Sequence, residues 1–208
     1  MQPPSSETGP VIAVFDFDHT LVKHDSFWSF LAYVVGWRRT IRTFLESLLA
    51  YAGRWAVNSY DRELRDKRTF IKSYLLRHLL AGRSLDELAP AIERLRRRQR
   101  WKEDVRQRLM EHYARGHHIV IASGGLDIYL KDLLQGVPYH GLICTVLERN
   151  SSGKITGVMS SGNCVRQRKA DLVAAYIAAH GPFADSWGYG NLPHDVPMLQ
   201  LVQHPVTV

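Results

Sequence analysis

The stretch VIAVFDFDHTL, residues 11–21, runs from an apolar segment straight into two carboxylates. Its apolar, partly β-branched beginning predicts a buried parallel strand over residues 11–16. Asp16 and Asp18 stand at the carboxyl end of this strand, and side chains two residues apart in an extended chain point to the same side. Ligands of open α/β sheets bind at that end of the strands. The stretch therefore predicts a binding site there.

Two neighbouring carboxylates repel each other and lose hydration unless a cation lies between them. Mg²⁺ is the economical candidate, because it is a hard cation that takes oxygen ligands. A DxD pair alone has plainer interpretations. One Asp could cap the following helix, and the other could be a solvated turn residue.

The rest of the chain predicts an α/β protein with a parallel sheet, because further strands alternate with helices. The expected strands are 117–125, 141–148, 185–191 and a final strand at PVTV, with a hairpin turning near Ser152 and Gly153 and a helix over 166–181. Apolar residues at three- and four-residue spacing predict helices through 24–115. We expect a disordered leader over 1–10, an α/β core over 11–23 and 116–208, and an inserted helical cap over 24–115.

Bulk composition narrows the class of protein. The chain has 208 residues and a net charge of +7, so anionic partners are plausible: a phosphate ester, an anionic membrane surface or nucleic acid. Cys144 and Cys164 form no CxxC pattern, which predicts two free thiols in a reducing, cytoplasmic setting. The first ten residues lack the features of a signal peptide, and no apolar run is long enough to span a membrane.

Polar residues follow three other predicted strands. Ser123, Gly124 and Gly125 follow IVIA and offer a hydroxyl and backbone N–H groups to a phosphate. Lys169 opens a helix, where it could balance phosphoryl charge. Asn191 and Asp195 lie in GYGNLPHDVPML and add oxygen ligands. Taken singly, each has an ordinary alternative: a strand-to-helix turn, a solvated lysine and a polar loop.

Together, and in this order, these motifs resemble the haloacid dehalogenase (HAD) superfamily, most closely its phosphoserine-phosphatase-like branch with a helical cap inserted after the first motif. FDFDHTL carries most of the specificity, and the similarity runs from Val11 to the end of the chain. The resemblance implies a Rossmann-like three-layer core with a parallel sheet, plus the cap. It also implies a Mg²⁺-dependent phosphomonoesterase that works through an aspartyl phosphate.

The resemblance also implies roles for single residues. Asp16 would be the nucleophile, Asp18 the general acid and base, and Lys169 the cation that holds nucleophile and phosphate together. The implied metal ligands are Asp16, Asp18 through its carbonyl, Asn191 and Asp195. The implied substrate-binding and phosphate-binding residues are Thr20, which supports the loop, Ser123, Gly124 and Lys169.

Two residues depart from the family pattern. His19 stands where glycine is most common, and Asn191 stands where the family usually has an acidic metal ligand. An Asn carbonyl oxygen can still coordinate Mg²⁺, with one negative charge fewer, so weaker metal binding is expected. A catalytically weak or inactive phosphate-binding protein is therefore one alternative. A phosphotransferase that uses the same aspartyl phosphate is another.

The substrate is less well defined. A small phosphorylated metabolite, such as a phosphoserine-like compound, and a lipid-headgroup phosphate monoester both stay open. Residues 27–57 are apolar and aromatic with four arginines, which suggests peripheral contact with an anionic membrane, at the inner membrane surface, unless these cap helices simply pack on each other. This stretch also looks like the branch with phosphatidylglycerophosphatase-type lipid phosphatases.

A basic run over 94–108 is expected on a helix, as a solvated face or an anion contact. Nucleic-acid binding is not favoured, because the chain has no recognised nucleic-acid module. The sequence does not predict the oligomeric state.

Overall fold

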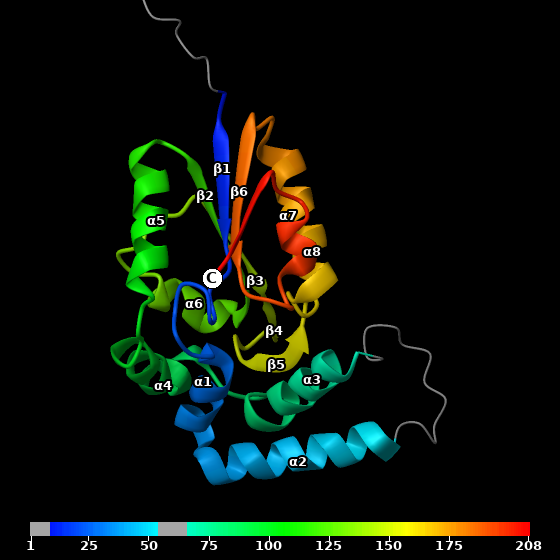
Figure 1. Cartoon of the computed structure of the whole chain (residues 1–208). Coiled ribbons are helices and arrows are strands. Elements are labelled where there is room, and N and C mark those ends of the chain that lie inside the picture. Colours follow the sequence, from blue (N-terminus) through cyan, green and yellow to red (C-terminus); the bar gives the residue numbers. More distant parts are fainter. Residues whose placement is uncertain (1–8, 54–65) are drawn as a thin grey trace, which may run out of the picture.

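A parallel sheet forms the centre of the molecule in the computed structural model, which describes residues 9–53 and 66–208. Its strands are β1 (Val11–Phe15), β2 (His118–Leu126), β3 (Gly141–Thr145), β6 (Asp185–Gly190) and β7 (His204–Thr207), in the order β3-β2-β1-β6-β7. All neighbouring strands in it run parallel. Helix α5 (Glu103–Ala114) covers one face, and α7 (Arg166–His180) with α8 (Val196–Leu199) covers the other (Figure 1). The predicted three-layer α/β fold is confirmed.

The alternation of side chains along β1 explains why this strand is central. Ile12, Ala13, Val14 and Phe15 have no exposed surface. Ala13 and Phe15 belong to the larger apolar cluster, and Ile12 and Val14 belong to a second cluster. Because successive side chains of a strand point to opposite faces, one apolar run fills both layers. The strand thereby delivers Asp16 to the edge of the sheet.

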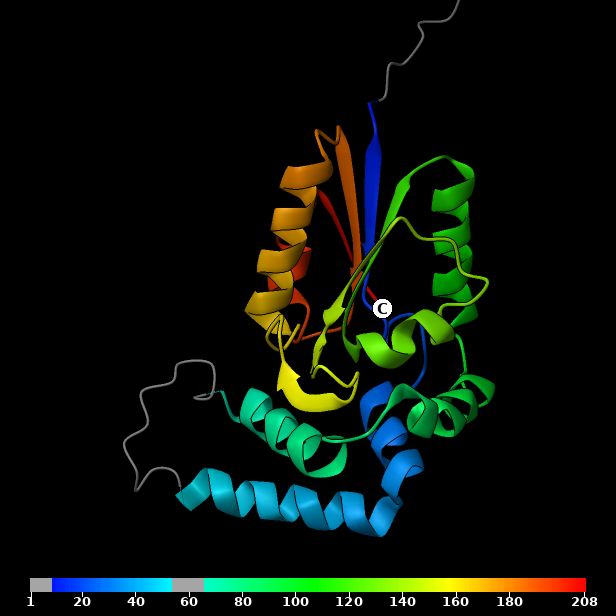
Figure 2. The ribbon, with the colours of Figure 1, turned by 180° about the vertical axis from the view of Figure 1, so that it is seen from behind.

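Four helices gather at the carboxyl end of the sheet: α1 (Ser26–Val35), α2 (Trp37–Gly53), α3 (Lys67–Leu79) and α4 (Leu85–Arg97) (Figures 1 and 2). Asp25 and Asp66 cap α1 and α3 by accepting from backbone N–H groups. Ser84 and Glu87 form the predicted capping box at the start of α4. The division of the chain into leader, core and cap stays a prediction, and residues 1–8 of the leader lie outside the described residues.

The basic run over 94–108 does not form the single helix that its composition predicts. Helix α4 ends at Arg97 and α5 begins at Glu103. Between them Trp101 pairs with Val22 in an isolated antiparallel bridge, and Lys102 N donates to Leu21 O. The chain turns here because these backbone bonds tie it to the loop after β1, and a continuous helix could not make them.

The predicted strand 141–148 is also divided. Strand β3 ends at Thr145, and β4 (Leu147–Arg149) pairs instead with β5 (Ile155–Met159) as an antiparallel hairpin. The predicted turn near Ser152 and Gly153 is confirmed. The hairpin packs on α3, where a side chain on Gly157 would lie 2.7 Å from Arg77 Cα. Glycine is therefore required at this contact between the hairpin and the helical end.

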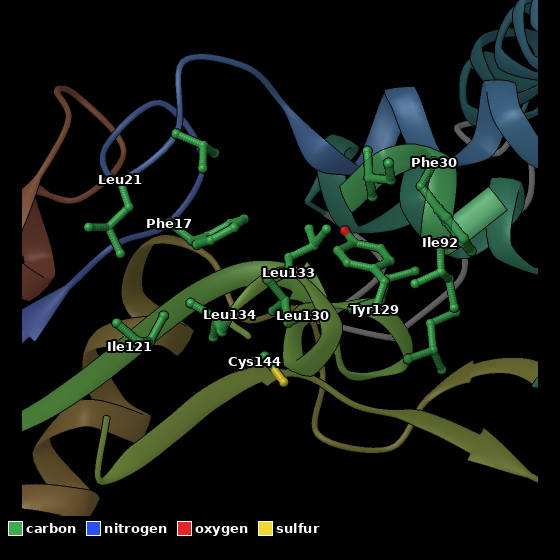
Figure 3. Close-up of a cluster of buried hydrophobic side chains, with 14 of the residues drawn as sticks. Phe17, Leu21, Phe30, Ile92, Ile121, Tyr129, Leu130, Leu133, Leu134 and Cys144 are labelled. Atoms are coloured by element: carbon green, nitrogen blue, oxygen red, sulfur yellow. The ribbon is translucent and has the colours of Figure 1, made fainter. Parts of the chain in front are cut away.

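Apolar side chains join the helices to the sheet in one continuous cluster, part of which Figure 3 shows. Phe15 stacks on Tyr189 at a ring-centroid distance of 4.3 Å, and Phe30 of α1 packs on Tyr129 of α6 (Asp127–Leu133) at 5.0 Å. Both cysteines are buried and free, as expected. Among the described helices, none combines the length and apolar character needed to cross a bilayer.

Candidate active site

Asp16 follows β1 directly and lies in a buried ion triad. Lys169 Nζ lies 2.6 Å from Asp16 Oδ1 and 2.7 Å from Asp195 Oδ1. Thr20 Oγ1 donates to Asp16 Oδ2 at 3.0 Å, which matches the supporting position expected for Thr20. The loop after β1, the start of α7 and the residue before α8 thus meet at one point. Three of the residues that the sequence singled out, Asp16, Lys169 and Asp195, therefore lie together, while their catalytic roles stay predictions.

The charges of the triad are unequal, because two buried carboxylates share one lysine. Burial raises the pKa of Asp16, and Lys169 opposes that rise. Burial alone would lower the pKa of Lys169, but Asp16 and Asp195 outweigh it and raise this pKa. Lys169 is therefore a permanent cation. When both carboxyls are ionised the triad carries an excess of negative charge, which a further cation would relieve.

Asp18 lies beside the triad and faces α1. Its two carboxylate oxygens accept from Ser26 N at 2.9 Å and from Ser26 Oγ at 3.0 Å. Burial, reinforced by the charges of Asp25 and Asp16, raises the pKa of Asp18 to about 8. A carboxyl with that pKa holds a proton at neutral pH, which suits a group that donates one.

The backbone conformation of His19, between Asp18 and Thr20, explains why the family most often has glycine at this position. His19 has φ 60°, in the left-handed region. That conformation is uncommon for a residue with a side chain, although His adopts it more readily than most. His19 lines the cavity described below, so its side chain adds an imidazole where glycine would leave open space.

Asn191 lies next to the backbone of Asp18. Its Nδ2 donates to Asp18 O at 3.4 Å, and its backbone N donates to Asp195 Oδ2 at 2.9 Å. Rotation of the side-chain amide by half a turn would place Oδ1 where Nδ2 lies. Asp16, the Asp18 carbonyl and Asn191 would then present oxygen atoms only, a donor set that fits Mg²⁺. Within residues 9–53 and 66–208, no three His, Cys, Asp or Glu side chains form a metal cluster, so this set depends on a carbonyl and an amide.

Ser123 and Gly124 lie in the last part of β2, before its end at Leu126, and of the two only Gly124 lines the cavity. Ser123 has no exposed surface, and its Oγ accepts from Gly125 N at 2.9 Å. Gly124 lies against the chain that leads into α7, where a Cβ would come within 2.8 Å of Val165 Cγ1. The expected phosphate contact therefore rests on the Gly124 backbone, and a direct role for the Ser123 hydroxyl stays a prediction.

Lys72 is a second buried lysine, and it comes from α3. Its Nζ donates to Gly124 O, to Thr145 Oγ1 at 3.0 Å and to Asn163 Oδ1 at 2.9 Å. Burial lowers the pKa of Lys72 to about 8. These acceptors are neutral and belong to the carboxyl end of the sheet and the loop before α7. Lys72 therefore ties the helical end of the molecule to the last part of β2, which contains Gly124.

These groups surround a cavity of about 450 Å³ between the sheet and the helices. Cations at its rim are Arg68, whose guanidinium lies 3.0 Å from His194 Nε2, and Arg166, which lies 3.7 Å from Asp66. Its wall away from the triad is aromatic and consists of Phe27, Trp28 and Phe44. The cavity thus combines a charged floor with an apolar wall.

The sequence-based prediction missed Lys72 and Asp25, which both line this cavity. A signal for Lys72 exists, because it interrupts the buried stripe of α3 that contains Thr69, Leu76 and Leu79. Asp25 Oδ1 accepts from Trp28 N, so Asp25 is a helix cap, and the sequence alone gives no sign of a further role. Only the fold reveals that the same carboxylate faces the cavity.

Comparison with known proteins connects this geometry to a family. Residues 13–200 match the family model described as haloacid dehalogenase-like hydrolase. Protein CicA of Caulobacter vibrioides is 26% identical to this chain over 96% of it and 87% of the relative. A histidinol-phosphatase of Neisseria meningitidis is 24% identical to this chain, and the match covers 95% of this chain and 89% of the relative. A substrate-bound phosphoserine phosphatase structure superposes with a TM-score of 0.64 at 17% identity, covering 97% of this chain and 87% of that one.

Replacing Lys169 by Met tests the ion triad. We expect the free energy of unfolding at pH 7 to fall by about 3–5 kcal/mol, because Asp16 and Asp195 would stay buried without a counterion. In the variant the folded-state pKa of these carboxyls lies above the unfolded value. The loss should therefore grow as pH rises through the acid range and shrink at pH 5. Urea unfolding at both pH values measures it.

The matched control is Lys131→Met, which removes an exposed lysine of α6 and should change stability by less than about 0.5 kcal/mol. Equal losses in the two variants, or a Lys169→Met loss that does not depend on pH, would contradict the triad as described.

Proposed function

The chain belongs to the haloacid dehalogenase-like hydrolase family, and from this we propose that it is a Mg²⁺-dependent phosphatase that cleaves phosphate monoesters through an aspartyl phosphate on Asp16. The observation that carries the proposal is the contact of Asp16 with Lys169 at the floor of the cavity. A buried carboxylate that is held by a permanent cation can act as a nucleophile and keep a dianionic phosphate beside it.

In the first step an Asp16 carboxylate oxygen attacks phosphorus, and the bond from phosphorus to the ester oxygen breaks. Lys169 offsets the negative charge on the phosphoryl oxygens, and the Gly124 N–H donates to one of them. The leaving alkoxide takes a proton from Asp18, whose raised pKa keeps it protonated at neutral pH. The products of this step are the free alcohol and an aspartyl phosphate.

In the second step a water molecule attacks the aspartyl phosphate. The Asp18 carboxylate, which lost its proton in the first step, takes one from this water. The bond from phosphorus to Asp16 breaks, and inorganic phosphate leaves. Asp18 is protonated again and Asp16 is a free carboxylate, so the enzyme returns to its starting state.

Asp16, the Asp18 carbonyl and Asn191 would hold Mg²⁺, and Asp195 would position Asn191 through its backbone N–H. When bound, the ion supplies charge that neutralises the phosphate and aligns it with the nucleophile. Asn191 contributes no charge, so this site should bind Mg²⁺ more weakly than one with a third carboxylate. Helices α1 to α4 would act as a cap, whereas α5, which the expected cap range 24–115 includes, covers a face of the sheet. Lys72 would join this cap to Gly124 of β2.

Two alternatives use the same site. A catalytically weak or inactive phosphate-binding protein is favoured only by Asn191, whereas Asp16, Asp18 and Lys169 are all present in the arrangement that catalysis needs. A phosphotransferase would pass the phosphoryl group from Asp16 to an alcohol in place of water. We propose hydrolysis, because the family is one of hydrolases.

For the substrate we propose a small phosphate ester that also bears an amino group. Two similar proteins are a phosphoserine phosphatase and a histidinol-phosphatase, and the phosphate esters in both names carry an amino group. Asp25 lines the cavity, and only its Oδ1 has a hydrogen bond within the described part of the chain. Its second oxygen could accept from an ammonium group. A lipid-headgroup phosphate monoester is the alternative, which the aromatic wall favours.

Replacing Asp16 by Asn tests the reaction. We expect hydrolysis of p-nitrophenyl phosphate to require Mg²⁺, to stop on chelation, and to fall by a factor on the order of 10³ or more in Asp16→Asn. Asp171→Asn, an exposed carboxylate of α7, is the matched control and should keep full activity. Hydrolysis that survives Asp16→Asn or chelation would refute the proposal. An inactive wild type that gains activity on Asn191→Asp would support the weak-enzyme alternative instead.

Replacing Asp25 by Asn tests the substrate class. We expect KM for phosphoserine and histidinol phosphate to rise about tenfold, because a charge-assisted hydrogen bond is lost, with no change in KM for p-nitrophenyl phosphate. The pKa of Asp18 also falls without the charge of Asp25, so kcat can change for all esters and KM is the readout. The exposed Asp86→Asn of α4 is the control. A uniform loss for all esters would argue against amine recognition. Preference of the wild type for a lipid-headgroup phosphate monoester would favour the lipid alternative.

A further inference from the structure

Helix α2 exposes its apolar side chains to solvent. Trp37, Ile41, Leu45 and Leu49 are 55%, 52%, 53% and 75% exposed. They follow one another at intervals of four residues, so they form one stripe along the helix. We call these four residues the α2 stripe. Single exposed apolar residues are common on proteins, but a continuous row of large ones marks an interaction surface.

The opposite face of α2 is polar and buried. Thr40, Thr43 and Ser47 are at most 5% exposed there. Two of their hydroxyls are satisfied within the helix, since Thr40 donates to Gly36 O and Ser47 donates to Phe44 O. Small side chains that satisfy their own hydrogen bonds let α2 pack closely on the molecule. The helix is thus stably seated with its apolar stripe facing outward.

Arginines lie along one side of the α2 stripe. Arg38, Arg39 and Arg42 are exposed and line a shallow groove with Glu46 and His78. Glu46 pairs with Arg42 at 2.8 Å, while Arg38 and Arg39 have no carboxylate partner within residues 9–53 and 66–208. The stripe is therefore bordered by positive charge that its own surroundings leave largely unbalanced.

We propose that the outer face of α2 docks on an anionic lipid bilayer, with the α2 stripe at the level of the headgroups and Arg38, Arg39 and Arg42 on lipid phosphates. A helix of this length spans about 26 Å and can lie in the plane of the interface. In both views α2 is the outermost element at the helical end of the molecule (Figures 1 and 2). Trp37 at one end of the stripe is the residue type that interfaces favour.

Charge decides between a membrane and a second copy of this chain. Two copies that met through their α2 stripes would bring two sets of these arginines together, with one glutamate on each helix to offset them. An anionic bilayer instead supplies the opposite charge beside an apolar layer. The observations therefore favour the membrane, and self-association becomes an outcome of the test.

The structure also shows which part of residues 27–57, the stretch that the sequence suggested for membrane contact, is exposed. Within residues 27–57, Phe30 and Leu31 are buried, and Phe27, Trp28 and Phe44 face the cavity. Arg54 and Trp55 lie outside the described residues. Among the described residues of this segment, the surface that stays available for docking is the outer face between Trp37 and Leu49. This inference does not depend on the proposed phosphatase activity.

Vesicle co-sedimentation of the full chain tests the proposal, with phosphatidylcholine vesicles that contain or lack phosphatidylglycerol. We expect binding at low salt to the anionic vesicles only, and weaker binding at high salt. We expect the constant for partitioning of the protein from water to the vesicles to fall about tenfold or more in each of two double variants, Ile41→Gln/Leu45→Gln and Arg38→Gln/Arg39→Gln. Met110→Gln/Val158→Gln, a pair of exposed apolar residues away from α2, is the matched control.

The proposal is overturned if the wild type does not bind, binds both vesicle types equally, or keeps its affinity in the α2 variants. It is also overturned if the wild type is a dimer in sedimentation velocity that Ile41→Gln/Leu45→Gln dissociates without any vesicle binding. Hydrolysis of p-nitrophenyl phosphate by each variant separates the two proposals, because α2 variants should keep the wild-type rate. The arginine pair tests docking even if the apolar pair misfolds.

Discussion

The buried contact of Lys169 with Asp16 and Asp195 is the interaction on which the site depends. It joins the end of β1, the first turn of α7 and the loop before α8, which are far apart in the sequence. One lysine between two carboxylates leaves negative charge at the floor of the cavity. In the proposed reaction that imbalance would attract Mg²⁺ and the lysine would attract the phosphate, so a single arrangement would serve both.

Much of this arrangement was predictable from the sequence. The apolar run of β1 buries both of its faces, which requires a central strand, and Asp16 follows it at once. Asp195 was expected near Asp16 because parallel strands end at one edge of a sheet, whereas Thr20 was expected there only from the resemblance to the family. Lys72 was not predicted, because its partners Gly124 and Thr145 lie more than 50 residues away. The break at Trp101 was missed for the same reason, since a long-range bridge to Val22 overrides local helical preference.

Helix α2 shows a different limit of prediction. The periodic pattern of its sequence identifies an apolar face and a polar face, and an amphipathic helix is usually predicted to bury its apolar face. Here the small hydroxyl residues pack inward and the α2 stripe stays outside. Phe44 lies between these faces and lines the cavity, where its ring is 5.3 Å from that of Trp28. The same helix therefore closes the cavity and presents the surface that we assign to a membrane.

The most direct measurement is the detection of the phosphorylated enzyme. The protein would be mixed with Mg²⁺ and a phosphate ester that it hydrolyses, quenched in acid within one turnover, digested and analysed by mass spectrometry. We predict a phosphoryl group on Asp16 that hydroxylamine removes, as an acyl phosphate requires. Turnover without any phosphorylated Asp16, or a phosphoryl group on another residue, would contradict the mechanism.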